Sequence, residues 1–118
     1  EALRANPAAP DGVIISQVMP YPYSGASPLV RDYQKLLKSD GISDFDYGSI
    51  EGYIAARVFV EGLKRAGRDL TREKLITAFE SMGNYDLGGF NVNFSPSNHV
   101  GSKFVEMTII NSNGQVIR

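Results

Sequence analysis

The sequence predicts an α/β chain with a strand, a proline-rich hinge, three helices and a closing strand hairpin. Two observations carry this prediction. Apolar residues recur at helical spacing in three stretches, and β-branched runs bounded by turn residues lie mainly near the two ends of the chain. Helices with broad apolar faces normally cover a sheet. We therefore expect that most of the parallel sheet lies outside these 118 residues.

The chain is expected to start with a strand and a crossing segment. Residues 12–19, GVIISQVM, are rich in β-branched side chains and end at a proline, which predicts a buried strand. Residues 20–28, PYPYSGASP, contain three prolines, which oppose a helix and favour an extended, semi-rigid hinge.

Three helices are expected next. Ser27-Pro28 supplies a cap and a first-turn proline for a one-faced helix that ends at Asp40-Gly41. The helix Ser49–Ala66 is apolar nearly all round, so we expect it to be largely buried, with Gly67 as its stop. Thr71 is the expected cap of the third helix.

The last part of the chain is expected to be an irregular loop followed by strands. Residues 84–102 are rich in glycine and asparagine, and they contain at most a short strand at Phe90–Phe94. Residues 103–110, KFVEMTII, alternate as a strand. Residues 111–118 return as a hairpin, with Asn113-Gly114 as the expected two-residue turn.

The composition excludes several kinds of function. The formal charge of −1 arises from 12 basic and 13 acidic residues spread along the chain, which leaves no basic field for nucleic acid. The absence of cysteine excludes disulfides and thiolate metal sites. The most apolar stretch, YIAARVFV, is too short to cross a bilayer. Residues 1–12 lack an initiator methionine and a signal-peptide pattern, so we expect a piece of a longer precursor.

The chemically active side chains do not form a recognisable catalytic or metal site. The single histidine, His99, lies in SPSNHVGS, but no G-x-S-x-G elbow presents a serine nucleophile. Asp44, Asp46 and Glu51 do not match a calcium-loop pattern, and we interpret them as a solvated loop and a helix entry. We therefore expect no enzyme activity, no catalytic residue, no metal and no cofactor.

The order of segments resembles one protein family. YGSIEGYIAARVFVEGLKRAGRDLTREKLITAFESM, the following DLGGF and SPSNHVGS, and the closing hairpin resemble the C-terminal part of the periplasmic substrate-binding proteins of branched-chain (Leu/Ile/Val-type) amino acid ABC transporters. These are two-lobed type I periplasmic binding proteins. The resemblance implies that residues 1–19 end a second-lobe segment and that 20–28 cross the hinge. It also implies that 29–102 belong to the first lobe and that 103–118 form the closing hairpin.

The resemblance also implies a function. A receptor of this family is secreted to the periplasm through a signal peptide in its precursor, binds an amino acid or a similar small molecule, and delivers it to the membrane permease of an ABC importer. The aromatic residues near the helix start would then line the ligand cleft, with Tyr47 as the first choice and Phe45 as the second. Ser49 and Tyr21 complete the expected set. The family's main polar ligand contacts come from earlier parts of its chain, so this chain alone should hardly bind ligand.

Two other interpretations stay open. Each aromatic residue could instead fill the core. The chain could also be a self-standing homodimeric interaction module of the α+β type that binds no ligand, because its wide apolar helix and unpaired strand edges favour self-association. A domain-swapped homo-oligomer that exchanges elements through residues 20–28 is the expected form of such an assembly. An enzyme that uses His99 is a weaker alternative.

Overall fold

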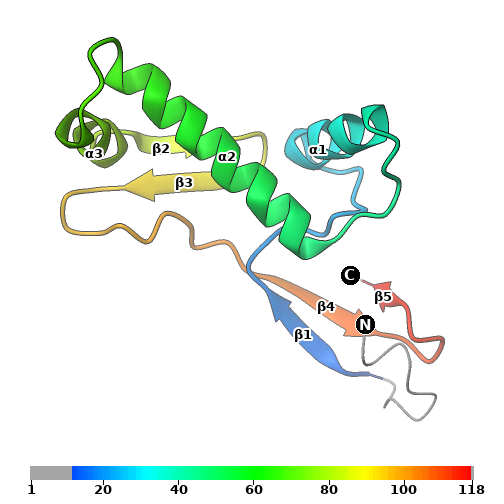
Figure 1. The fold of residues 1–118 in the computed structure, drawn as a ribbon. Helices are drawn as coiled ribbons and strands as arrows, with labels where there is room; N and C mark the ends of the chain where they lie inside the picture. Colours follow the sequence, from blue (N-terminus) through cyan, green and yellow to red (C-terminus); the bar gives the residue numbers. More distant parts are fainter. Residues whose placement is uncertain (1–11, 118) are drawn as a thin grey trace. The chain divides into compact units, whose positions relative to one another are not determined.

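The computed structural model describes residues 12–117, which divide into two compact units. The first unit contains residues 12–18 and 105–117, and the second contains residues 19–104. All helices formed by residues 12–117 belong to the second unit (Figure 1). In the described part of the chain every paired strand is antiparallel, which confirms the prediction of an α/β fragment that lacks most of the parallel sheet.

The first unit is a three-stranded antiparallel sheet in the order β1-β4-β5. Its strands are β1 Ile14–Gln17, β4 Glu106–Ile110 and β5 Val116–Ile117. The side chain of Thr108 is buried and donates a hydrogen bond to the Ile15 carbonyl at 3.2 Å.

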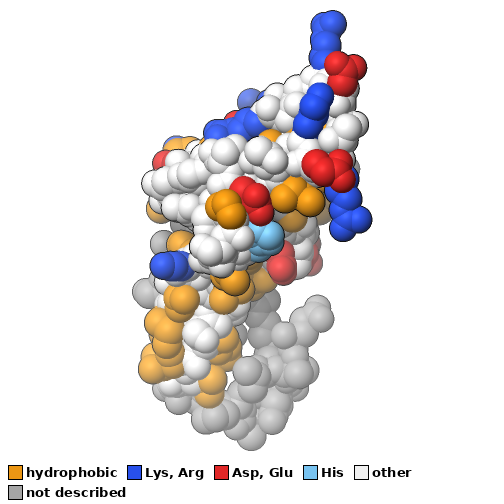
Figure 2. Space-filling model, turned by 90° about the vertical axis from the view of Figure 1, so that its left-hand side faces the viewer, with side chains coloured by type: hydrophobic (Ala, Val, Ile, Leu, Met, Phe, Trp, Pro, Cys, Tyr) orange, Lys and Arg blue, Asp and Glu red, His pale blue; other side chains and the backbone are white. Residues whose placement is uncertain are grey.

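The expected burial of the first strand is wrong within this chain. Ile14 and Val18 are each 61% exposed, and the lower part of Figure 2 shows hydrophobic side chains on the surface of this unit. The physical reason is that the three strands have no helix of their own unit to cover them among the described residues.

Residues 111–115 separate β4 from β5, and Asn111 pairs with Gln115, so that the turn between them has three residues, 112–114, rather than the expected two. The Asn111 amide donates to the Gln115 carbonyl at 3.0 Å, and the residue before β5 thus pairs back across the loop. The Asn111 side-chain oxygen also accepts from the amides of Asn113 and Gln115. Gly114 has a φ of 70°, as the third residue of such a loop requires.

The helices of the second unit are α1 Pro28–Ser39, α2 Tyr47–Ala66 and α3 Arg72–Glu80. Ser27 and Thr71 cap α1 and α3 through their side-chain oxygens, and α2 ends at Gly67, as expected. Helix α2 starts two residues earlier than expected because Asp46 caps it, with its carboxylate accepting from the Ser49 amide at 2.8 Å. The helix-entry interpretation of Asp46 is therefore confirmed.

Helix α2 is buried on one face only. Ile50, Ile54 and Val58 lie in the core, whereas Phe59 is 49% exposed and Val60 is 46% exposed. The expectation of a largely buried helix is thus wrong within this chain, because the described elements of the second unit cover only one side of α2.

A hairpin that the sequence reasoning missed follows α3. Strand β2, Gly83–Asp86, pairs with β3, Asn91–Phe94, and α2 packs above this hairpin (Figure 1). Gly88 and Gly89 form the turn with φ values of 104° and 95°, which glycine adopts readily. The Asp86 carboxylate accepts hydrogen bonds from both glycine amides.

The core of the second unit joins α1, α2 and the hairpin. Its most buried large side chains are Leu29, Val30, Tyr33, Ile50 and Phe90. The Leu29 amide donates to the Gly88 carbonyl at 3.1 Å, so the hairpin turn is fixed to the first turn of α1. None of the described helices combines the length and the apolar character that a bilayer crossing requires.

Candidate ligand-binding site

An aromatic cluster lies where the segment before α1 meets the start of α2. It consists of Tyr21, Tyr23, Tyr33, Phe45 and Tyr47, all of the second unit. The ring centroids of Tyr21 and Tyr47 are 6.4 Å apart, and those of Tyr21 and Tyr23 are 5.8 Å apart. Tilted aromatic pairs at these distances attract each other, so the rings hold one another in place.

The segment that carries Tyr21 and Tyr23 is fixed by two side chains of α1. The Gln34 amide donates to the carbonyls of Pro22 at 2.8 Å and Ser24 at 3.4 Å. The Arg31 guanidinium donates to the carbonyls of Gly25 at 2.7 Å and Ala26 at 3.3 Å. The backbone carbonyls of this segment therefore attach it to α1. The expected role of the segment as the hinge stays a prediction.

Tyr23 joins the same segment to the loop before α2. Its hydroxyl donates to the Asp44 carboxylate at 2.7 Å and accepts from the Phe45 amide at 3.1 Å. The Tyr21 carbonyl accepts from the Ser24 amide at 3.0 Å, which makes a turn where the sequence predicted an extended crossing. Pro20 and Pro22 are buried.

The start of α2 offers fewer free amides than the sequence suggested. The Ser49 amide is occupied by the Asp46 carboxylate, and the Ser49 hydroxyl lies 2.6 Å from the Tyr33 hydroxyl. Hydrogen bonds from the Ser49 amide, and then from the Ser49 hydroxyl, hold the pKa of Asp46 below its ordinary value. Ser49 thus links α1 with α2, a contact that its sequence position did not reveal.

The four predicted ligand residues lie together, but they differ in exposure. Phe45 is 8% exposed and packs between Tyr33 and Tyr23, so the core-filling alternative describes it in this chain. Tyr21, Tyr47 and Ser49 are half-buried. Tyr21 and Tyr47 are the two partly exposed aromatic residues of the set, which makes them its best candidates. The ligand contacts themselves stay a prediction.

His99 has an acidic partner that the sequence did not indicate. Its Nε2 atom lies 3.0 Å from the Glu80 carboxylate, although the two residues are 19 positions apart. Both residues line an apolar groove on the other side of α2 from Val60. Among residues 12–117, histidine and acidic side chains do not gather in groups of three that could hold a metal ion.

Comparison with known proteins identifies the family of the chain. The sequence model of a family described as periplasmic binding protein matches residues 1–115. The chain belongs to this family. Its members are binding receptors rather than enzymes, and the expected resemblance to the type I receptors is confirmed. A search of the curated proteins finds no match.

Solved structures of similar fold include three bacterial receptors. An extracellular ligand-binding receptor from Verminephrobacter eiseniae superposes with a TM-score of 0.82 at 30% identity, over 95% of this chain and 32% of that one. A possible leucine/isoleucine/valine-binding protein from Rhodopirellula baltica has a TM-score of 0.77 at 28% identity, over 92% of this chain and 30% of that one.

The third structure is a substrate-binding periplasmic protein from Ralstonia solanacearum, with a TM-score of 0.77 at 30% identity. It is matched over 94% of this chain and 32% of its own length. The chain therefore spans about a third of the length of the periplasmic binding proteins that it resembles.

Proposed function

We propose that this chain forms part of a two-lobed periplasmic receptor that binds an amino acid or a related small organic molecule for an ABC importer. The observation that carries the proposal is the family match over residues 1–115. The receptor would be secreted to the periplasm and would pass its ligand to a membrane permease. Residues 1–19 and 103–118 would belong to the second lobe and residues 29–102 to the first, with 20–28 between them.

The aromatic cluster supports a particular kind of ligand. Tyr21 and Tyr47 offer ring surface for an apolar ligand body, and their half-buried rings can be covered further without unfolding any element. The remaining two thirds of the receptor would supply most of the polar groups that recognise the ligand's charged end. The similar protein from Rhodopirellula baltica is described as a possible leucine/isoleucine/valine-binding protein, and this favours aliphatic amino acids as ligands.

Ligand titration of the longer receptor tests this proposal. Loss of a well-buried aromatic contact costs on the order of 1–3 kcal/mol, so Tyr47→Ala should weaken binding about 5- to 150-fold. Tyr21→Ala should act in the same direction. Tyr85→Ala is the matched control, because Tyr85 lies on β2 and its ring contacts Arg65 rather than the cluster.

The control decides between a site and a general loss of structure. If Tyr85→Ala weakens binding as much as Tyr47→Ala, the effect is structural. If neither Tyr47→Ala nor Tyr21→Ala changes the affinity while the receptor still binds its ligand, the site lies elsewhere and the rings serve only packing.

A homodimeric interaction module is the second candidate function. The half-exposed Phe59 and Ile76 favour it, because isolated apolar surface promotes association. Exchange of elements through residues 20–28 would give a domain-swapped dimer. Sedimentation velocity at micromolar concentration tests the idea, and a stable, compact monomer would contradict it.

A further inference from the structure

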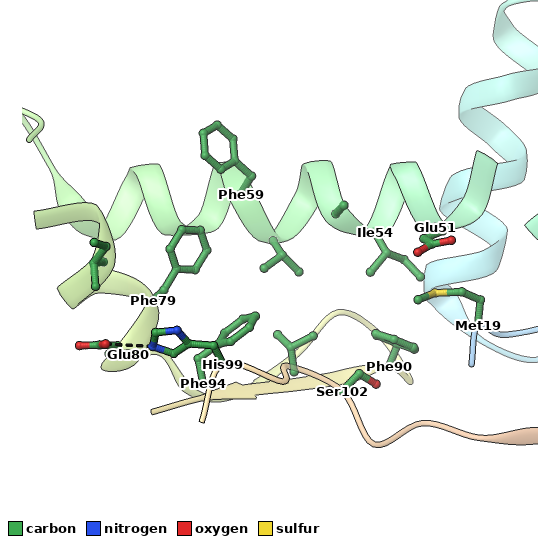
Figure 3. A pocket seen from close by; sticks show the side chains of 14 residues that line it. Met19, Glu51, Ile54, Phe59, Phe79, Glu80, Phe90, Phe94, His99 and Ser102 are labelled. Atoms are coloured by element: carbon green, nitrogen blue, oxygen red, sulfur yellow. Dashed lines mark hydrogen bonds and ion pairs between the residues drawn. The ribbon is translucent and has the colours of Figure 1, made fainter. Parts of the chain in front are cut away.

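Two features of the second unit have no role in the proposed ligand contacts. One is the apolar groove between α2 and the β2–β3 hairpin, where Phe79 lies between helix and strands and Glu80 pairs with His99 at one end (Figure 3). None of the described residues that line this groove belongs to the aromatic cluster. The other feature is Tyr23, which lies inside the cluster and makes polar contacts there.

The Tyr23 hydroxyl makes two hydrogen bonds to the loop that leads into α2. It donates to the Asp44 carboxylate at 2.7 Å and accepts from the Phe45 amide at 3.1 Å. The hydroxyl thus acts as donor and as acceptor at the same time. Phe45 is 8% exposed, so its partly buried amide would lose an acceptor if the hydroxyl were removed, and such a loss is costly.

These hydrogen bonds lie close to both candidate ligand rings. Tyr21 comes two residues before Tyr23, and Tyr47 comes two residues after Phe45. The Tyr23 ring centroid is 5.8 Å from that of Tyr21 and 5.2 Å from that of Phe45. The Tyr23 hydroxyl therefore joins the segment that carries Tyr21 to the segment that carries Tyr47.

The hydroxyl of Tyr23 can be separated from its ring by mutation. The side chain is 46% exposed, so burial of the ring accounts for only part of what a tyrosine contributes at this position. Phenylalanine would keep the ring contacts with Tyr21 and Phe45 and would remove only the two hydrogen bonds.

We propose that Tyr23 is a positioning residue for ligand binding, whose hydroxyl holds the Tyr21 ring against Tyr47 before the ligand arrives. Its effect on the ligand acts through Tyr21. A surface that is ordered in advance binds more tightly, because the ligand does not have to order it. This role rests on the proposed function, in which Tyr21 contacts the apolar body of the ligand.

Titration calorimetry of the longer receptor with L-leucine tests the role. Tyr23→Phe should weaken binding about 3- to 10-fold, the range expected for loss of a hydrogen bond that orders the site. The unfolding midpoint of the receptor should fall by about 4 °C or less. Tyr85→Phe is the matched control, because it removes a hydroxyl from β2, outside the cluster, and should leave the affinity unchanged.

A double-mutant cycle separates positioning from direct contact. In a receptor that already carries Tyr21→Ala, Tyr23→Phe should change the affinity by less than about 2-fold, because the ring that it positions is gone. A direct contact between Tyr23 and the ligand, or a general loss of structure, would weaken binding by the same factor in both backgrounds.

Amide hydrogen exchange of the ligand-free receptor gives a second test. Tyr23→Phe should speed exchange at Phe45 and in residues 23–26, whereas Tyr85→Phe should not, because only the first variant removes the hydrogen bonds of the Tyr23 hydroxyl. Unchanged exchange at these amides would overturn the positioning role, whatever ligand the receptor binds.

The binding results distinguish failure of this role from failure of the proposed site. If Tyr21→Ala weakens binding but Tyr23→Phe does not, or if Tyr23→Phe acts equally in both backgrounds, the positioning role is wrong and the site stands. If Tyr21→Ala and Tyr47→Ala both leave L-leucine binding unchanged, the site and the positioning role fail together. A receptor that does not bind L-leucine would contradict aliphatic ligands, and hydrogen exchange would then decide on the Tyr23 contacts.

Discussion

Replacing Gly88 with alanine should destabilise the second unit more than a Gly→Ala replacement at any other described turn glycine with a positive φ. Gly88 sits in the turn of the β2–β3 hairpin at φ 104°, where a side chain strains the backbone. An added Cβ would meet the Leu29 amide nitrogen and the Pro28 Cβ at 3.1 Å each. The same residue's carbonyl accepts the Leu29 amide, so a shift to relieve the overlap would weaken that hydrogen bond.

The magnitude follows from these two effects. Backbone strain and overpacking each cost roughly 1–3 kcal/mol, and together they should lower the free energy of unfolding by about 2–6 kcal/mol. For a unit of this size each kcal/mol corresponds to about 4–8 °C, so the unfolding midpoint should fall by about 10 °C or more.

Thermal unfolding followed by circular dichroism measures this change, with Gly52→Ala as the control. Gly52 is an exposed glycine inside α2, and an added Cβ would meet nothing within 4 Å. Alanine there should raise the stability by about 0.5–1 kcal/mol through its better helix propensity. If Gly88→Ala unfolds at the wild-type temperature while Gly52→Ala is stabilised, the hairpin turn does not rest on the start of α1 as described.

Acid should also destabilise the chain, because amide hydrogen bonds lower the pKa of Asp46 and of Asp86 in the fold. Their contribution is complete above the ordinary pKa of 3.8 and is lost as the pH falls through the lower folded values. Denaturant titrations at several pH values should show this loss. In the double variant Asp46→Asn, Asp86→Asn the free energy of unfolding should fall less steeply with decreasing pH, and an unchanged pH dependence would count against these carboxylate hydrogen bonds. Gln34→Ala should speed amide hydrogen exchange in residues 21–26, since the Pro22 carbonyl loses its donor, whereas the exposed Lys35→Ala should not; equal exchange in both would mean that Gln34 does not hold the segment. His99→Ala should leave ligand binding by the longer receptor unchanged, because the half-exposed pair with Glu80 contributes little; a loss of binding at unchanged thermal stability would contradict the structural role.

Local signals in the sequence were sufficient to locate the helices. Ser27 and Thr71 cap their helices through hydrogen bonds to amides three residues later, so these boundaries depend on neighbouring residues alone. Helix α2 starts before the predicted Ser49 because Asp46, which the sequence pattern groups with an acidic loop, caps the helix.

The missed hairpin shows how weak strand signals can be. Strand β2 consists of Gly83, Asn84, Tyr85 and Asp86, and only the tyrosine favours a strand. Gly88-Gly89 between Leu87 and Phe90 was the available signal, since paired glycines between apolar residues favour a two-residue hairpin turn. Tertiary packing against α1 and α2 supplies the stability that the strand residues lack.

The candidate site could be predicted only in part. The sequence identified Tyr21, Phe45, Tyr47 and Ser49 as a set, and the fold brings them together. It could not reveal that Tyr33, 16 residues earlier on α1, would hold Ser49, because such pairing depends on how α1 packs on α2. The open groove beside Phe59 likewise emerges only from the three-dimensional arrangement, since a helical wheel does not show which face stays uncovered.

Calorimetric titration with a panel of L-amino acids, on the longer receptor and on this chain alone, tests the central claim most directly. If the chain is one part of a solute-binding receptor, the longer receptor should bind at least one aliphatic or aromatic amino acid, or a close relative, in a saturable way. This chain alone should show no measurable binding, because a site with one wall cannot enclose its ligand. Saturable binding by the chain alone with the affinity of the receptor, or no binding of any such molecule by the receptor, would contradict the account.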